Sequence, residues 1–162
     1  MQKKLLKSAR NAIALDESQM FNTVLADKGF QDFILFLNKS QLFDGEDSLG
    51  VKLEKIGGGY SFTTEFLSSG ETFSFAGESK TKRAGNSPFL LDSGDYYNSY
   101  NLKLGNGFFV IDSDPQKEDN NLEDIYGDNL EGLQDENLQK IIDVVYKKFV
   151  QEVRREISGQ NI

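Results

Sequence analysis

The most regular pattern of apolar and polar residues lies near the C-terminal end of the chain. Apolar side chains recur there at intervals of three and four residues, which is the repeat of one face of an α-helix. Asp135 can cap the start of this helix, and basic residues near its end complement the helix dipole. We therefore expect a helix over residues 136–157 whose apolar stripe belongs to the core. The stripe consists of Leu138, Ile141, Ile142, Val145, Phe149, Val153 and Ile157.

The N-terminal end shows helical spacing in three segments. Residues 1–14 have a narrow apolar stripe, which fits either a terminal helix lying on the domain or an arm, residues 1–15, that docks on a neighbouring subunit. Asp16 or Ser18 can cap a second helix that Gly29 breaks, and a third helix then continues to about residue 40. Because both later helices have a face of large apolar residues, we expect them to pack on a sheet.

The middle of the chain alternates weakly between apolar and polar residues, which favours strands. The alternation covers residues 51–53, 60–66 and 73–75, in segments rich in Phe, Tyr and Thr. Residues 68–71 (SSGE) suit a hairpin turn between the last two segments. The three glycines at 57–59 lack the Gly-Lys-Ser/Thr ending of a phosphate-binding loop, so we expect a bend, bulge or loop there.

Residues 77–88 contain no large apolar residue and are expected to form a mobile, exposed loop. Lys80, Lys82 and Arg83 make the compact positive patch of this loop, well separated in sequence from the basic N-terminus. These charges can be a solvated loop tip. They can also contact an acidic partner surface, such as that of another copy of this acidic chain.

An apolar segment, an aromatic cluster and a hairpin follow in residues 89–112. Residues 89–91 are apolar, and the Asp-Ser-Gly segment after them can form a turn or start a short helix. That helix would carry Tyr96, Tyr97 and Tyr100. Gly105-Asn106-Gly107 then separates two strand-like segments, as in a β-hairpin.

After the hairpin, an acidic loop leads to residues 121–126, which can make one or two helical turns ended by Gly127. Together the segments predict one α+β domain of 162 residues. We expect a mostly antiparallel sheet packed by the N-terminal helices and the long C-terminal helix. Thirteen Phe and six Tyr residues provide enough burial for a core without disulfides or metal.

Composition excludes several kinds of chemistry. The chain has no cysteine and no histidine, so zinc sites built from these residues and nucleophiles activated by histidine are impossible. The formal net charge of −8 argues against tight nucleic-acid binding, because phosphate would be repelled. The longest apolar run, residues 33–37, is too short to cross a bilayer, and no signal-peptide pattern follows the basic start. We expect a soluble protein made in a cytoplasm, with no membrane partner.

Two acidic loops invite a calcium interpretation and fail it. The calcium loop of twelve residues needs glycine at its sixth position and glutamate at its twelfth. A loop starting at Asp44 has Leu49 and Lys55 there, and one starting at Asp112 has Lys117 at its sixth position. We interpret residues 44–48 as a solvated turn and expect neither a metal nor another cofactor. Carboxylate pairs remain possible catalysts, but the pattern singles out no catalytic residue, and we expect that the protein is not an enzyme.

Residues 91–99 (LDSGDYYNS) resemble a segment of small neck proteins of tailed bacteriophages, the tail-completion and head–tail connector group that also includes virion morphogenesis proteins. That family has a Leu-x-x-(Thr/Ser)-Gly segment, a hairpin, a Tyr-Gly or Glu-Phe-Gly segment and a C-terminal helix. Residues 108–111 and 125–127 fit the later parts, while Ser93 replaces the more common Thr. Residues 42–50 also resemble a segment in phages of gut Bacteroidota, including crAss-like phages.

The resemblance covers residues 40–157 and implies a structural role. Such proteins form rings that join the portal and head to the tail and leave a channel for DNA, without a cofactor or a reaction. It implies copies of the chain itself and other neck, portal or tail proteins as partners, in a virion assembled in the host cytoplasm. The candidate subunit-interface residues are Lys80, Lys82, Arg83, Tyr96, Tyr97 and Tyr126. The alternative is a small soluble protein-binding module without catalytic activity.

Overall fold

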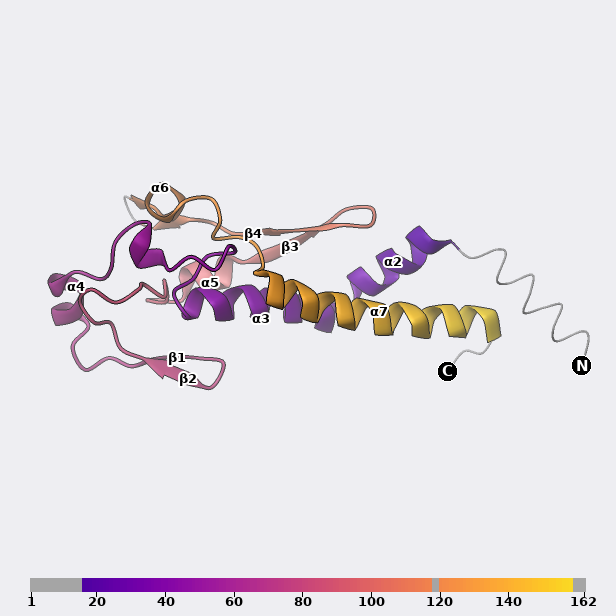
Figure 1. Cartoon of the computed structure of the whole chain (residues 1–162), viewed down its shortest axis with the longest axis horizontal. Helices are drawn as coiled ribbons and strands as arrows, with labels where there is room; N and C mark the ends of the chain where they lie inside the picture. Colours follow the sequence, from indigo (N-terminus) through magenta and orange to yellow (C-terminus); the bar gives the residue numbers. More distant parts are fainter. Residues whose placement is uncertain (1–15, 118–119, 159–162) are drawn as a thin grey trace, which may run out of the picture.

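The structure, a computed structural model, describes residues 16–117 and 120–158 and has the predicted α+β class (Figure 1). The predicted arm at residues 1–15 lies outside these ranges. The helices are α2 (Glu17–Ala26), α3 (Lys28–Phe43), the 3-10 helix η1 (Leu53–Lys55), α4 (Phe62–Leu67), α5 (Asp95–Ser99), α6 (Leu122–Tyr126) and α7 (Asp135–Ser158). The strands are β1 (Phe73–Phe75), β2 (Glu78–Lys80), β3 (Asn101–Leu104), β4 (Phe109–Asp112), β5 (Gln116–Lys117) and β6 (Asn120–Asn121).

All strand pairs in the described ranges are antiparallel and belong to three separate two-stranded sheets. The longest is the hairpin β3–β4, in which Asn101 lies opposite Asp112 and Leu104 lies opposite Phe109. It forms at the predicted Gly-Asn-Gly turn, as expected for glycines between two strand-like segments. Within residues 16–117 and 120–158, no helix is long and apolar enough to cross a membrane.

Two aspartates define the helices at the N-terminal end. The side chain of Asp16 accepts a hydrogen bond from the Gln19 amide at 3.0 Å and caps α2. Asp27 ends α2 and caps α3, accepting from the Phe30 amide at 2.7 Å. The prediction that Gly29 breaks the helix is therefore wrong, because Gly29 lies inside the first turn of α3. A capping side chain decided the boundary, and the glycine two residues later was tolerated.

The strands predicted before residue 67 are wrong, because η1 and α4 occupy this part of the chain. Ser61 caps α4 by accepting a hydrogen bond from the Thr64 amide at 3.0 Å. The hairpin turn is also elsewhere. It lies between β1 and β2 at Ala76 and Gly77, whose φ values are 54° and 85°. Two positive φ values in a two-residue loop match the twist of a hairpin.

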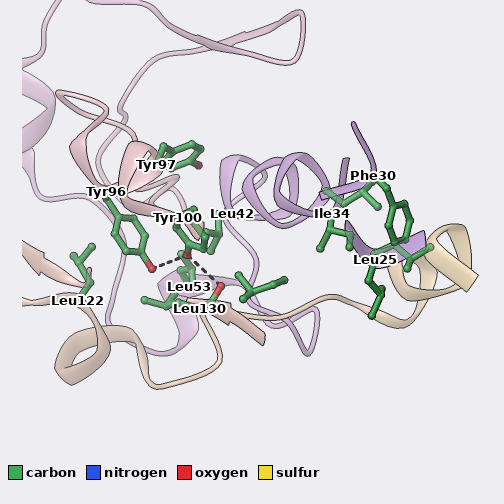
Figure 2. Packing of buried hydrophobic residues seen from close by; sticks show 13 residues of the cluster. Leu25, Phe30, Ile34, Leu42, Leu53, Tyr96, Tyr97, Tyr100, Leu122 and Leu130 are labelled. Atoms are coloured by element: carbon green, nitrogen blue, oxygen red, sulfur yellow. Dashed lines mark hydrogen bonds between the residues drawn. The ribbon is translucent and has the colours of Figure 1, made fainter. Parts of the chain in front are cut away.

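The core is one continuous cluster that joins α3, α5, η1, α6 and the first turns of α7. Figure 2 shows Tyr100 pointing at Tyr96 and at the carbonyl of Leu130, to which its hydroxyl donates at 2.7 Å and 3.4 Å. Burying three tyrosines is favourable here because such hydrogen bonds satisfy their polar ends. The buried members of the cluster include Leu25, Phe30, Ile34, Leu42, Leu53, Tyr96, Tyr97, Tyr100, Leu122, Leu130 and Ile141.

The C-terminal helix forms as predicted, but its stripe is not continuous core. Of the apolar stripe, only Ile141 is fully buried within the described part of α7. Leu138 and Ile142 are exposed, and Phe149 is half-buried. Helix α7 packs against α2 and α3 along one side, and these short neighbours leave part of the stripe uncovered. The prediction that the stripe belongs to the core therefore holds for Ile141 and in part for Val145, and is wrong for Leu138 and Ile142.

Candidate functional site

The predicted positive patch is largely engaged inside the chain. Residues 78–80 form strand β2, and the ammonium of Lys80 lies 2.6 Å from the Asp44 carboxylate and 2.9 Å from the Phe43 carbonyl. It also lies 4.7 Å from the centre of the Phe43 ring, a cation–π contact. Lys80 therefore fastens the β1–β2 hairpin to the end of α3.

Lys82 is buried, so the prediction of an exposed loop over residues 77–88 is wrong at this position. Its ammonium lies 4.4 Å from the centre of the Phe73 ring and 2.5 Å from the Asp92 carboxylate. Lys117 reaches the other oxygen of Asp92 at 2.7 Å. Hydrogen bonds from Lys117 and Lys82 lower the pKa of Asp92 to about 2. The prediction took these charges as free because their acidic partners are distant in sequence.

Arg83 is the member of the patch that remains most available for another molecule. Its guanidinium lies 3.2 Å from the Glu65 carboxylate, while about two thirds of its side chain stays exposed, 65%. Glu65 also accepts a hydrogen bond from the amide of Ala84 at 2.9 Å. This pairing fixes the segment after Lys82 against helix α4.

Two of the three tyrosines proposed for an interface belong to the core. Tyr96 and Tyr97 are buried, and the Tyr97 hydroxyl donates to the Phe89 carbonyl at 2.7 Å. Burial raises the pKa of Tyr96 to about 12. Neither ring is available to a second subunit, so their assignment to an interface is corrected. Tyr126 is half-buried, and a Cβ added at Gly57 would lie 2.6 Å from its ring.

A cleft of about 410 Å³ brings Lys82 and Tyr126 together. Among the residues that the structure describes, Asp92 is the only acidic one that lines this cleft, and two lysines hold its carboxylate. With a pKa of about 2, Asp92 cannot donate a proton near neutral pH, and its basicity is too low for an effective general base. The cleft has the chemistry of a structural ion-pair site.

The acidic turn after α3 is a structural turn as well. Asp47 is buried, and one carboxylate oxygen accepts hydrogen bonds from the amides of Leu49 and Val51 at 2.9 Å and 2.8 Å. The expectation of a solvated turn is therefore wrong for Asp47, although the turn itself is present. Nowhere in residues 16–117 and 120–158 do three acidic side chains group closely enough to hold a metal ion.

An apolar groove of about 490 Å³ runs between α2, α7 and the tip of the β3–β4 hairpin. Asn22 of α2 positions the hairpin, because its side chain donates to the Asn106 side chain and accepts from the Gly107 amide, each at 3.0 Å. The groove is almost entirely apolar, and several of its large side chains are exposed. We call it the groove, and define it by Phe21, Leu25, Phe108, Phe109, Leu138, Ile141, Ile142, Val145, Tyr146 and Phe149.

A second apolar surface projects from the short helix α4. Phe62, Phe66 and Leu67 are 84%, 79% and 76% exposed. Phe62 and Phe66 are four residues apart and therefore lie on one face of the helix. We call these three residues the knob. Sequence reasoning missed the knob because it assigned residues 60–66 to a strand, although the spacing of the two phenylalanines also fits a helix.

Comparison of this chain with protein-family models, with curated proteins and with solved structures found no match to any of them.

Proposed function

We propose that this chain is a structural subunit of the neck of a tailed bacteriophage, where copies form a ring that joins the portal and head to the tail. The resemblance of residues 91–99 and of the later hairpin and Tyr-Gly segment supports the setting. In this proposal the protein acts in the virion, after assembly in the host cytoplasm. It catalyses no reaction.

The observation that carries the proposal is the uncovered groove. Apolar side chains at Phe108, Ile142 and Tyr146 remain exposed along one face of α7 and the hairpin tip. A single chain gains nothing from this exposure, and contiguous apolar surface on a folded protein marks a binding surface. A subunit that functions only in an assembly can expose such an apolar surface, because neighbouring subunits cover it after assembly.

The charge of the chain also favours a ring through which DNA passes over a protein that binds DNA tightly. The net charge is −8, and Lys80 and Lys82 are held by Asp44 and Asp92. An acidic lining would let DNA pass without gripping it, since each phosphate would be repelled. We therefore propose contacts to proteins, without tight binding of nucleic acid.

The test is the composition of purified phage particles. Mass spectrometry of DNA-filled particles should find this chain, with about six or twelve copies per particle as a closed ring requires. Labelled antibody should bind at the junction of head and tail in electron micrographs. Absence of the chain from intact, infectious particles would contradict the proposal.

The groove also fits the alternative, a soluble protein-binding module. An amphipathic helix of another protein can lay its apolar face into such a groove. In that case the purified chain would stay monomeric, and particles would lack it. A ring subunit would instead associate with itself, so the mass of the purified chain in solution separates the two.

A further inference from the structure

The knob and the groove lie on different ends of the molecule. Figure 1 shows α4 at one end, with α2, the tip of β3–β4 and most of α7 toward the other. The knob is convex, since its three side chains are more than three quarters exposed. The groove is concave and has a volume of about 490 Å³. One chain cannot join its own two surfaces across this distance.

We propose that the knob of one copy seats in the groove of the next copy, so that the chain assembles head to tail. This inference rests on the proposed function and names the contact that would build the ring. Each knob-to-groove contact leaves one knob and one groove free to bind further copies. The series of contacts closes into a ring when the rotation between neighbouring copies allows it. A groove facing a second groove would instead give a closed dimer.

The exposed area suits a weak contact that is repeated in every subunit. An aromatic side chain carries roughly 150–250 Å², so the knob exposes about 400–500 Å². The exposed parts of the groove residues Phe108, Leu138, Ile142 and Tyr146 together amount to about 400 Å². Joining them would remove about 900 Å² from water. Specific interfaces start near 1,000 Å² and commonly reach about 1,600 Å², so a single contact is weak while a closed ring has one on each side of every subunit.

Charge does not oppose the contact. The Glu65–Arg83 pair lies beside the knob, one charge of each sign. On α7, Asp143 and Lys147 are exposed and neighbour the groove residues Ile142 and Tyr146 in sequence. Because both surfaces carry both signs, opposite charges are available to pair at the edge of the contact.

Three single variants test the contact. Phe66→Glu places a charge on the knob, and Ile142→Glu places one in the groove. Leu49→Glu is the matched control, because Leu49 is 70% exposed and belongs to neither surface. We expect wild type and the control to associate with rising concentration in analytical ultracentrifugation, and each of the other variants to stay monomeric. Circular dichroism should show that all four proteins are folded.

Mixing the two defective variants gives the sharpest result. Phe66→Glu keeps an intact groove, and Ile142→Glu keeps an intact knob. A head-to-tail contact therefore predicts that the mixture forms a heterodimer that cannot grow, because the remaining two surfaces are both defective. Association of Phe66→Glu alone at the strength of wild type would overturn the proposal in favour of groove-to-groove pairing.

Cross-linking covers the case in which association is too weak to see by mass. The chain has no cysteine, so single cysteines can be placed freely. Under mild oxidation, a mixture of Thr63→Cys and Lys147→Cys chains should give a disulfide-linked heterodimer, because these exposed positions lie beside the knob and beside the groove and leave both surfaces intact. Leu49→Cys mixed with Lys147→Cys should not. The inference is overturned if the wild-type chain stays monomeric and the two cysteine variants also fail to cross-link. It is overturned as well if the Leu49→Cys control cross-links equally well.

The two proposals fail differently. If the chain is present in particles but its knob and groove cysteines never cross-link, the head-to-tail contact is wrong and the neck assignment stands. If the cysteines cross-link in the purified chain and particles lack it, the contact stands and the neck assignment is wrong.

Discussion

Two regions of this molecule have similar apolar content and opposite degrees of burial. Around Phe89, the rings of Phe43, Tyr60 and Phe73 pack at 5.3–5.5 Å between centres, and Phe89 itself is only 3% exposed. Along the groove, Tyr146 is 69% exposed although its helix is the most regular in the chain. Periodicity identifies the face of a helix that prefers to leave water. Neighbouring elements decide whether that face is covered.

The difference follows from what surrounds each region. Phe89 is contacted from α3, from strand β1 and from Tyr60 before α4, so segments distant in sequence close over it. Within residues 16–117 and 120–158, the outer face of α7 has only α2 and the hairpin tip at its sides. The aromatic region is therefore covered within one chain, whereas the described residues leave the groove open, and we propose that a second copy covers it.

The largest expected effect breaks the aromatic region. Phe89→Ala should lower the free energy of unfolding by about 3–5 kcal/mol, because it removes a buried ring and leaves a cavity. Phe108→Ala is the matched change in the groove and should cost less than about 1 kcal/mol, since that ring is mostly exposed. Urea denaturation followed by circular dichroism measures both. Equal losses would mean that the two regions do not differ as described.

The elements predicted correctly are those whose signals are local. Asp16 caps α2, the Gly-Asn-Gly segment turns β3 into β4, and the long apolar period forms α7. Each of these depends on residues within a few positions of one another. The errors at residues 60–66 arose where local signals conflict, because Phe62 and Phe66 fit both a strand and a helix, and the Ser61 cap decided for the helix.

The second prediction concerns the ion pair beside the aromatic region. Asp92→Asn should lower the free energy of unfolding by about 2 kcal/mol near pH 7, because the buried Lys82 ammonium loses its charged partner. Lys117→Met is the control and should cost less than about 1 kcal/mol, since the Lys117 side chain is 44% exposed and Lys82 still pairs with Asp92.

The pH dependence gives this prediction its sign. The pKa of Asp92 is lowered from 3.8 to about 2 in the folded protein. A lowered pKa stabilises the fold above the unfolded value, and this contribution is lost as pH falls from about 4 toward 2. The gap between wild type and Asp92→Asn should therefore be full at neutral pH and shrink over that range. A gap that stays constant down to pH 2 would show that the carboxylate charge is not its source.

The sequence does not reveal which of the charged and aromatic candidate residues are buried. Lys82 looked free because Phe73 and Asp92 reach it only after folding. Tyr96 and Tyr97 are interface candidates under the resemblance, yet both rings are buried in the core. The groove has no signal of its own in the sequence, because it exists only between α2, α7 and the hairpin.

A smaller effect is expected inside the tyrosine cluster. Tyr100→Phe removes the hydroxyl that donates to Tyr96 at 2.7 Å and should lower the free energy of unfolding by about 1 kcal/mol. Tyr146→Phe makes the same chemical change on an exposed ring and should have no measurable effect. Thermal unfolding of both variants measures the difference. If the Tyr100→Phe and Tyr146→Phe variants have the same melting temperature, the Tyr100 hydroxyl contributes no net stability.

The smallest effect on stability should coincide with a complete loss of association. Tyr146→Ser removes a side chain that is 69% exposed in the single chain, so the free energy of unfolding should change by less than about 0.5 kcal/mol. The same change removes part of the groove surface that would contact a second copy, so the variant should not show the association expected of wild type. Melting temperature and sedimentation measure the two properties on one sample. A melting temperature lowered by several degrees would show that Tyr146 already contributes to the stability of the isolated chain. The groove would then not differ from the aromatic region around Phe89 in the way described.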